Sequence, residues 1–135
     1  MKTIWFDATF GRPWVITLEN LFSMRKESEP FLRHIYAVSK PKEQDPSWIS
    51  KLDENEFIII SGDRGNKKPR LPQICREKQI THIILSSTVH HSSRFERARA
   101  IIMLWPHLLE TFEAPSGSRF QIEKSGVDYA LIPKN

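Results

Sequence analysis

The sequence predicts an α/β fold, a three-layer sandwich around a mostly parallel central sheet, with a small hairpin at the C-terminus. Short apolar runs alternate with amphipathic segments along the chain, which is the pattern of consecutive strand and helix units. The clearest run, Phe57 to Ile60, is continuously apolar and rich in isoleucine, as in parallel strands that are covered on both faces. The length of 135 residues indicates one domain, spanning 1–135.

Four short runs are expected to form the parallel strands, because each is too short for a helix and is bounded by polar or charged residues. The first run ends directly at Asp7. Two further segments near the C-terminus are separated by a Ser-Gly pair and predict a hairpin or two short strands. The four runs are Ile4 to Phe6, Ile35 to Val38, Phe57 to Ile60 and His82 to Leu85, and the terminal pair is Phe120 to Glu123 and Tyr129 to Ile132.

Four helical segments are expected between these strands. Pro13 suits the first turn of a helix, and apolar residues follow it at a spacing of three to four. Asp45 followed by Pro46 is a helix start signal, because the carboxylate accepts backbone N–H protons and proline has none to lose. Pro106 should kink or restart the last helix. The segments are Trp14 to Lys26, Pro46 to Asp53, Pro69 to Lys78 and Ser92 to Phe112.

The composition narrows the class of protein. The net charge of +4 and the pI near 9.4 favour a polyanionic partner such as a nucleic acid. The single cysteine, Cys75, excludes an internal disulfide framework and a cysteine-based zinc site, which is typical of a reducing compartment. The longest apolar run, Ile101 to Trp105, is far shorter than the roughly 20 residues of a membrane span. The N-terminal residues meet Asp7 too early for a secretion signal. We therefore expect no membrane segment and a cytoplasmic location.

Three aspartates lie where a ligand is expected in a parallel sheet. Asp7 and Asp63 follow two strands at their carboxyl ends, and Asp45 begins a helix at the same edge. Clustered carboxylates repel one another unless a cation neutralises them, and Mg²⁺ or Mn²⁺ prefers such oxygen ligands. The pattern predicts a metal site able to activate water against a phosphodiester. For Asp45 a plain helix cap is the open alternative.

Basic and hydroxyl side chains accompany the three aspartates. Four basic residues are expected to hold the phosphate backbone of a nucleic acid. Two serines after the fourth strand are expected either to position water or phosphate or to cap the long helix that follows. His90 and His91 are interpreted as an exposed polar connection outside the site. The absence of a glycine-rich phosphate loop disfavours a kinase or NTPase. The basic residues are Arg12, Arg64, Lys67 and Lys68, and the serines are Ser86 and Ser87.

These motifs resemble the PIN-like domain of VapC-type toxins. The resemblance rests on Asp7 after the first strand, Gly11-Arg12 before the first helix, Asp45 to Ile49 at a helix start, and Phe57 to Arg64 with Asp63. It covers residues 1 to about 123 and depends on the order and spacing of the motifs. It implies a Mg²⁺- or Mn²⁺-dependent endoribonuclease, the toxin of a type II toxin–antitoxin pair, that acts on RNA and is neutralised by a cognate antitoxin protein. The sequence leaves open whether the protein forms a homodimer.

One departure from the family keeps a second hypothesis open. The family's second acidic position is normally a glutamate between the first two strands, and here only Glu19, Glu27 and Glu29 are loose candidates. The alternative is a catalytically inactive PIN-like module that binds a protein partner or RNA. A receiver-like domain with Asp63 as phosphoacceptor is disfavoured, because the paired N-terminal acids and the strand-end lysine of such domains are absent.

Overall fold

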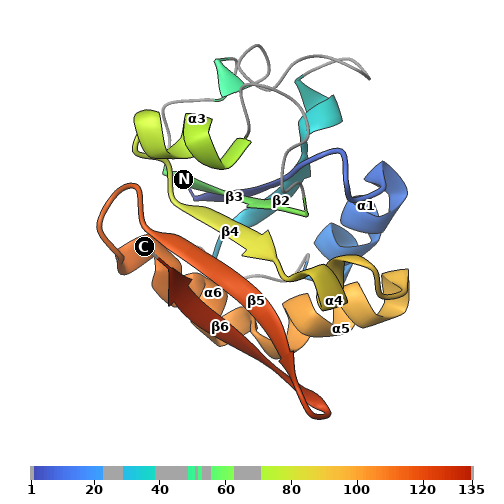
Figure 1. Ribbon diagram of the computed structural model, residues 1–135. Helices are drawn as coiled ribbons and strands as arrows, with labels where there is room; N and C mark the ends of the chain where they lie inside the picture. The colour runs from blue at the N-terminus through green and yellow to red at the C-terminus, as the bar shows by residue number, and fades with distance from the viewer. Residues whose placement is uncertain are drawn as a thin grey trace.

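A computed structural model of the chain describes residues 2–22, 29–38, 49–50, 52, 56–62 and 71–134. Strands and helices alternate along the described residues (Figure 1). In chain order they are β1 (Thr3–Phe6), α1 (Arg12–Leu21), β2 (Phe31–His34), the 3₁₀ helix η1 (Ile35–Ala37), β3 (Phe57–Ser61), α3 (Leu71–Glu77), β4 (His82–Leu85), α4 (Ser87–His90), α5 (Arg94–Met103), α6 (Trp105–Glu110), the 3₁₀ helix η2 (Thr111–Glu113), β5 (Arg119–Ser125) and β6 (Asp128–Lys134).

The strands form one mixed sheet in the order β2-β1-β3-β4-β5-β6. The pairs from β2 to β5 are all parallel, and β6 pairs antiparallel with β5. The predicted α/β class with a mostly parallel sheet is therefore confirmed. The C-terminal hairpin is confirmed as well, and its two-residue turn has Gly126 at a φ of 64°, a backbone conformation that favours glycine.

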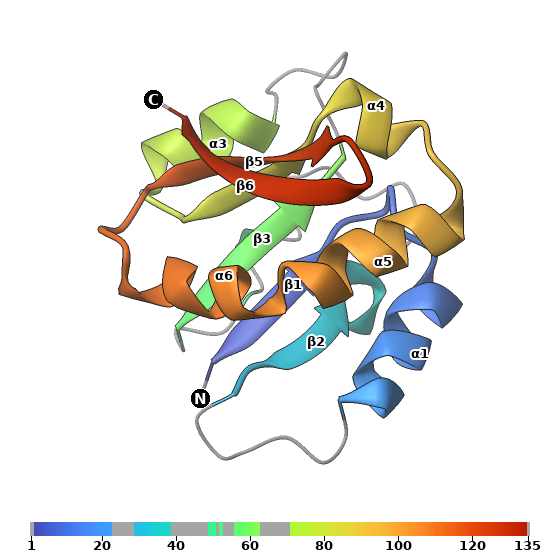
Figure 2. The same cartoon turned by 90° about the horizontal axis from the view of Figure 1, so that it is seen from below.

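Helices cover both faces of the sheet, so the chain is built in three layers (Figures 1 and 2). Helices α1, α5 and α6 pack on one face, where Phe6 and Ile60 contribute to a large apolar cluster. Helix α3 packs on the other face, where Trp5 and Ile59 join Leu71 in a second cluster. Because neighbouring strand residues point to opposite faces, burial on both sides requires the continuously apolar strands seen in the sequence.

The second strand was predicted in the wrong place. The run Ile35 to Val38 forms η1 and a turn, and the strand is the preceding segment, Phe31–His34. Strand β2 lies at the edge of the sheet, and its residue Arg33 is exposed, so the segment lacks the continuous apolar character of a covered strand. The chain turns at His34, whose Nδ1 accepts a hydrogen bond from the Tyr36 N–H at 3.1 Å and caps the 3₁₀ helix.

The predicted last helix, Ser92 to Phe112, is divided into α5, α6 and η2. The restart at Pro106 is confirmed, because this proline lies in the first turn of α6, where its missing N–H costs no helix hydrogen bond. Helix α4 before it was not predicted as a helix. The predicted helix over Pro69 to Lys78 corresponds to α3, with Leu71, Ile74 and Cys75 buried as expected.

Two predicted helical segments fall partly outside the described residues. Helix α1 begins at Arg12, before the predicted start at Trp14, and it ends at Leu21, inside the predicted range. Residues 23–28 are not described. The predicted helix Pro46 to Asp53 lies mostly outside the described residues, although Ile49 within it is buried. No helix in the described ranges is long and apolar enough to cross a membrane.

Candidate functional site

The carboxyl ends of β1 and β3 form a switch point in the sheet. After β1 the chain crosses through α1 to β2 on one side, whereas after β3 it crosses through α3 to β4 on the other side (Figure 1). Ligands of open α/β sheets bind in the crevice outside such a point. Asp7 follows β1 and Gly62 follows β3, so both residues lie at this edge.

Asp7 is held in one orientation although it lies in a turn. Its side chain is buried, with 5% of the residue exposed, and its backbone N–H donates to the Ile60 carbonyl of β3 at 3.2 Å. The Thr9 N–H donates to Oδ1 at 3.1 Å, and the Thr9 hydroxyl donates to Oδ2 at 3.2 Å. These bonds fix both carboxylate oxygens at the carboxyl end of β1, as predicted from the position of Asp7 after the strand.

His34 fixes the turn that follows Asp7. Because Nδ1 of His34 accepts from Tyr36, Nε2 carries the proton and donates to the Phe10 carbonyl at 2.6 Å. Burial lowers the pKa of His34, and the positive charge of Arg12 lowers it further. The hydrogen bond to the Phe10 carbonyl raises the pKa, but the net shift is downward. The ring is therefore neutral near pH 7 and connects β2 to the turn that carries Asp7 and Thr9. This role of His34 was not predicted from the sequence.

Gly62 brings His90 of α4 to the same edge. A Cβ atom at Gly62 would lie 2.3 Å from His90 Nδ1 and 2.6 Å from Thr9 Cγ2, so the imidazole ring occupies the space of the missing side chain. The Arg97 guanidinium donates to the His90 carbonyl at 3.1 Å and ties α5 to α4. Contrary to the prediction, His90 is only partly exposed and packs against the end of β3.

The close packing at Gly62 makes a substitution there costly. We expect Gly62→Ala to lower the free energy of unfolding by about 1–3 kcal/mol, because the new methyl group collides with His90 and Thr9. Urea denaturation measures the effect. Adding Thr9→Ser, which removes a methyl group and keeps the hydroxyl bonded to Asp7, should recover part of the loss.

Gly11 provides the matched control for Gly62. It precedes α1 with a φ of −70°, and a Cβ atom added there would lie 3.9 Å from its nearest neighbour, Pro13 Cδ. Gly11→Ala should therefore change the free energy of unfolding by less than about 1 kcal/mol, the scale of a helix-cap effect. Equal losses in the two variants would show that His90 and Thr9 do not pack against Gly62.

Ser86 and Ser87 follow β4 at the same edge, and the structure assigns Ser86 the capping role. Its Oγ accepts the Val89 N–H at 3.3 Å at the start of α4. Ser87 is exposed, and its carbonyl accepts a hydrogen bond from His91 Nδ1 at 2.9 Å. Ser86 is therefore a helix cap, but it caps the short helix α4, and Ser93 caps α5 of the predicted long helix.

The remaining predicted site residues divide into two groups. Arg12 is exposed at the first position of α1, next to the edge that holds Asp7. Within the described ranges, no three His, Cys, Asp or Glu side chains are grouped so that they could hold a metal. Convergence of the three aspartates remains a prediction, because two of them and three of the four predicted basic residues lie outside the described residues. These are Asp45, Asp63, Arg64, Lys67 and Lys68.

Comparison with known proteins identifies no family for this chain. No protein-family model, no curated protein and no solved structure matches it.

Proposed function

We propose that the protein is a metal-dependent endoribonuclease that cleaves RNA phosphodiesters at the carboxyl edge of β1 and β3. The observation that carries this proposal is the fixed, buried carboxylate of Asp7 at the switch point of the sheet. A buried charge requires partners, and Thr9 supplies two hydrogen bonds to it. Asp63 follows Gly62 directly in the sequence.

The Asp7 carboxylate is chemically suited to a hard divalent cation. A carboxylate has about four acceptor positions, so the two bonds from Thr9 are compatible with metal ligation by Asp7. Asp7, Asp45 and Asp63 would hold Mg²⁺ or Mn²⁺, whose oxygen preference they match. When bound, such an ion supplies Lewis-acid activation of water and of the phosphodiester.

The protein's own residues account for the other requirements of the reaction. Arg12, exposed at the first position of α1, would pair with a substrate phosphate, and the sequence adds Arg64, Lys67 and Lys68 after β3. The exposed hydroxyl of Ser87 would position a phosphate or a water molecule. His34 and Thr9 would keep the Asp7 carboxylate in place during the reaction, because both bind the same turn.

The proposal also includes a biological role for the endoribonuclease. The resemblance to PIN-like domains of VapC-type toxins supports a toxin of a type II toxin–antitoxin pair, with a cognate antitoxin protein as partner. The positive net charge of +4 agrees with an RNA substrate.

Cleavage of a single-stranded RNA by the purified protein tests the proposal. We expect cleavage with Mg²⁺ or Mn²⁺ and none after chelation with EDTA, because the aspartates alone cannot stabilise the charge that develops on the phosphate. RNA that is bound and left intact in both conditions would instead identify the non-catalytic module.

A further inference from the structure

The exposed apolar side chains of the protein gather on one helical layer. Among the described residues, six large hydrophobic side chains are exposed, and five of them belong to α1 and α5. The sixth, Val127, lies at the turn between β5 and β6. The five are Ile16, Leu21, Phe95, Ile102 and Met103, with exposed fractions from 40% to 73%. A clustered apolar surface of this kind is typical of an interaction site.

A groove runs between α1 and α5. At one end the Trp14 indole N–H donates to the Arg94 carbonyl at 3.0 Å, and at the other end the rings of Phe22 and Trp105 stack with centroids 4.2 Å apart. The two helices therefore run in the same direction, side by side on one face of the sheet (Figure 2). Between them lies a hollow of about 340 Å³, lined by Pro13, Trp14, Thr17, Leu18, Arg94, Phe95 and Ala98.

The walls of the groove continue along both helices. On α5, Phe95, Ala98 and Ile102 recur at spacings of three and four, and on α1 Thr17 and Leu21 recur at a spacing of four. These spacings place each set on one side of its helix. The row of residues from Pro13 to Leu21, which begins at the hollow and continues past it, is about 12 Å long at 1.5 Å per residue. That length matches about two turns of a helix laid into the groove.

The floor of the groove is fixed by the core. The Trp14 ring packs against Phe10, with centroids 4.9 Å apart, and against Phe6, with centroids 5.5 Å apart. Leu18 is buried with 4% exposure. Because these side chains are held by the aromatic cluster under α1, the groove exists before any partner binds and requires little ordering on binding.

The charges around the groove select its occupant. Arg94 lines the hollow, is exposed, and forms no ion pair within the described part of the chain. The acids of the two helices are already engaged. Glu19 accepts the Leu32 N–H at 2.6 Å, and Glu96 accepts the Tyr129 hydroxyl and lies 3.7 Å from Arg99.

We propose that this groove binds a short amphipathic helix of a partner protein, with aliphatic or aromatic anchors on one face and acidic residues beside them. The apolar walls of Leu21, Phe95 and Ile102 receive the anchors, and an acidic residue beside them pairs with Arg94. A second copy of the chain fits poorly, because its own groove would bring arginine against arginine. The inference does not depend on the ribonuclease proposal.

A labelled peptide tests the groove directly. The probe is a fluorescein-labelled amphipathic peptide with leucine at positions i, i+3 and i+7 and glutamate beside them, and fluorescence anisotropy measures its binding to the full chain. We expect Phe95→Ser and Arg94→Glu each to weaken binding at least about tenfold. Val127→Ser is the matched control, because Val127 is equally exposed but lies outside the groove, and it should bind as the wild type does.

Three results would overturn the inference. The same peptide with lysine in place of glutamate should not bind. Equal binding of the two peptides would show that the charge of the groove does not determine its partner. Sedimentation that shows a dimer abolished by Phe95→Ser would assign the groove to a second copy. Loss of single-stranded RNA binding in Phe95→Ser, with normal circular dichroism, would assign it to RNA.

Discussion

Replacing Asp7 with asparagine is expected to reduce metal-dependent RNA cleavage at least about 100-fold, a loss of about 2.7 kcal/mol of transition-state stabilisation. The carboxylate loses its negative charge, so it no longer attracts a divalent cation to the end of β1. The fold should survive, because the asparagine carbonyl can still accept the Thr9 N–H and the Thr9 hydroxyl can accept from the new amide. Cleavage rates of a labelled RNA under excess Mg²⁺ measure the effect.

Asp128 supplies the control for Asp7. It is exposed at the start of β6, so Asp128→Asn makes the same chemical change on the surface of the hairpin. This variant should cleave RNA at the wild-type rate. Asp7→Asn with wild-type activity and a wild-type unfolding midpoint would remove Asp7 from the reaction.

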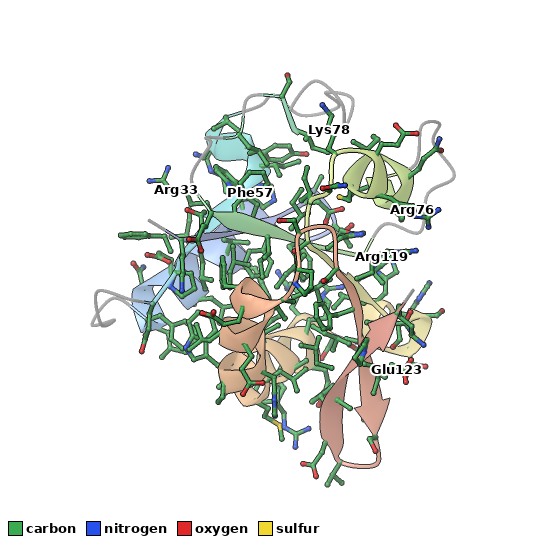
Figure 3. The ribbon with its side chains drawn as sticks, turned by 90° about the vertical axis from the view of Figure 1, so that its left-hand side faces the viewer. Arg33, Phe57, Arg76, Lys78, Arg119 and Glu123 are labelled. Carbon is green, nitrogen blue, oxygen red and sulfur yellow. The ribbon has the colours of Figure 1, made fainter. Side chains whose placement is uncertain are left out.

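A buried histidine is expected to make the fold sensitive to acid. His82 of β4 is 1% exposed, and its Nε2 is hydrogen-bonded to Ser61 Oγ at 2.7 Å. Burial lowers the pKa of His82 from 6.5 to about 4, and Arg119, its partner position in β5, adds to the shift. Figure 3 shows Arg119 and Arg76 of α3 on the same side of the sheet.

The direction of the pH effect follows from the lowered pKa. Above pH 6.5 both the folded and the unfolded states are neutral at His82. Between pH 6.5 and pH 4 the unfolded state binds a proton that the folded state does not, so stability falls as the pH falls. At about 1.4 kcal/mol for each pH unit, the loss of unfolding free energy reaches about 3 kcal/mol. His34 adds a loss in the same direction, because its pKa is lowered too.

Urea denaturation at several pH values between 7 and 4 measures this loss. His82→Gln keeps an amide able to bind Ser61 but does not titrate, so its stability should fall much less over the same range. His107 is the control, because its side chain is 61% exposed and His107→Gln should leave the wild-type slope unchanged. An unchanged slope in His82→Gln would contradict the assignment to His82.

Those parts of the fold that depend on local pattern were predictable from the sequence. The run Phe57 to Ile60 is apolar at every position, which identifies a strand with two covered faces, and it forms the central strand β3. Pro106 restarts a helix because proline lacks an N–H wherever it occurs. These signals need no knowledge of the neighbouring segments.

Errors arose where one side-chain hydrogen bond, and not the hydrophobic pattern, decides the structure. The sequence from Ile35 to Val38 has strand character, but the hydrogen bond from Tyr36 to the His34 ring turns it into a 3₁₀ helix. Helix α4 is only four residues long, too short to show a periodic pattern, and depends on the Ser86 cap.

The candidate site could be predicted from the sequence only in part. Asp7 could be placed, because it ends the first strand and parallel strands share one carboxyl edge. Its supporting residues could not be placed from the chain alone. Thr9, two residues after Asp7, offered a weak signal as a turn former. His34 and His90 reach the site only through the pairing of β2 with β1 and the packing of α4 on Gly62.

Analysis of the RNA cleavage products by mass spectrometry, in ¹⁸O-labelled water, is the most direct test of the central claim that this edge hydrolyses RNA with a metal ion. We predict cleavage that depends on Mg²⁺ or Mn²⁺, with one ¹⁸O atom incorporated into the terminal phosphate that each cleavage creates and no cyclic phosphate, because water is the nucleophile in the proposed reaction. Products with 2′,3′-cyclic phosphate that form equally in EDTA, or RNA that stays intact with either ion, would contradict the account.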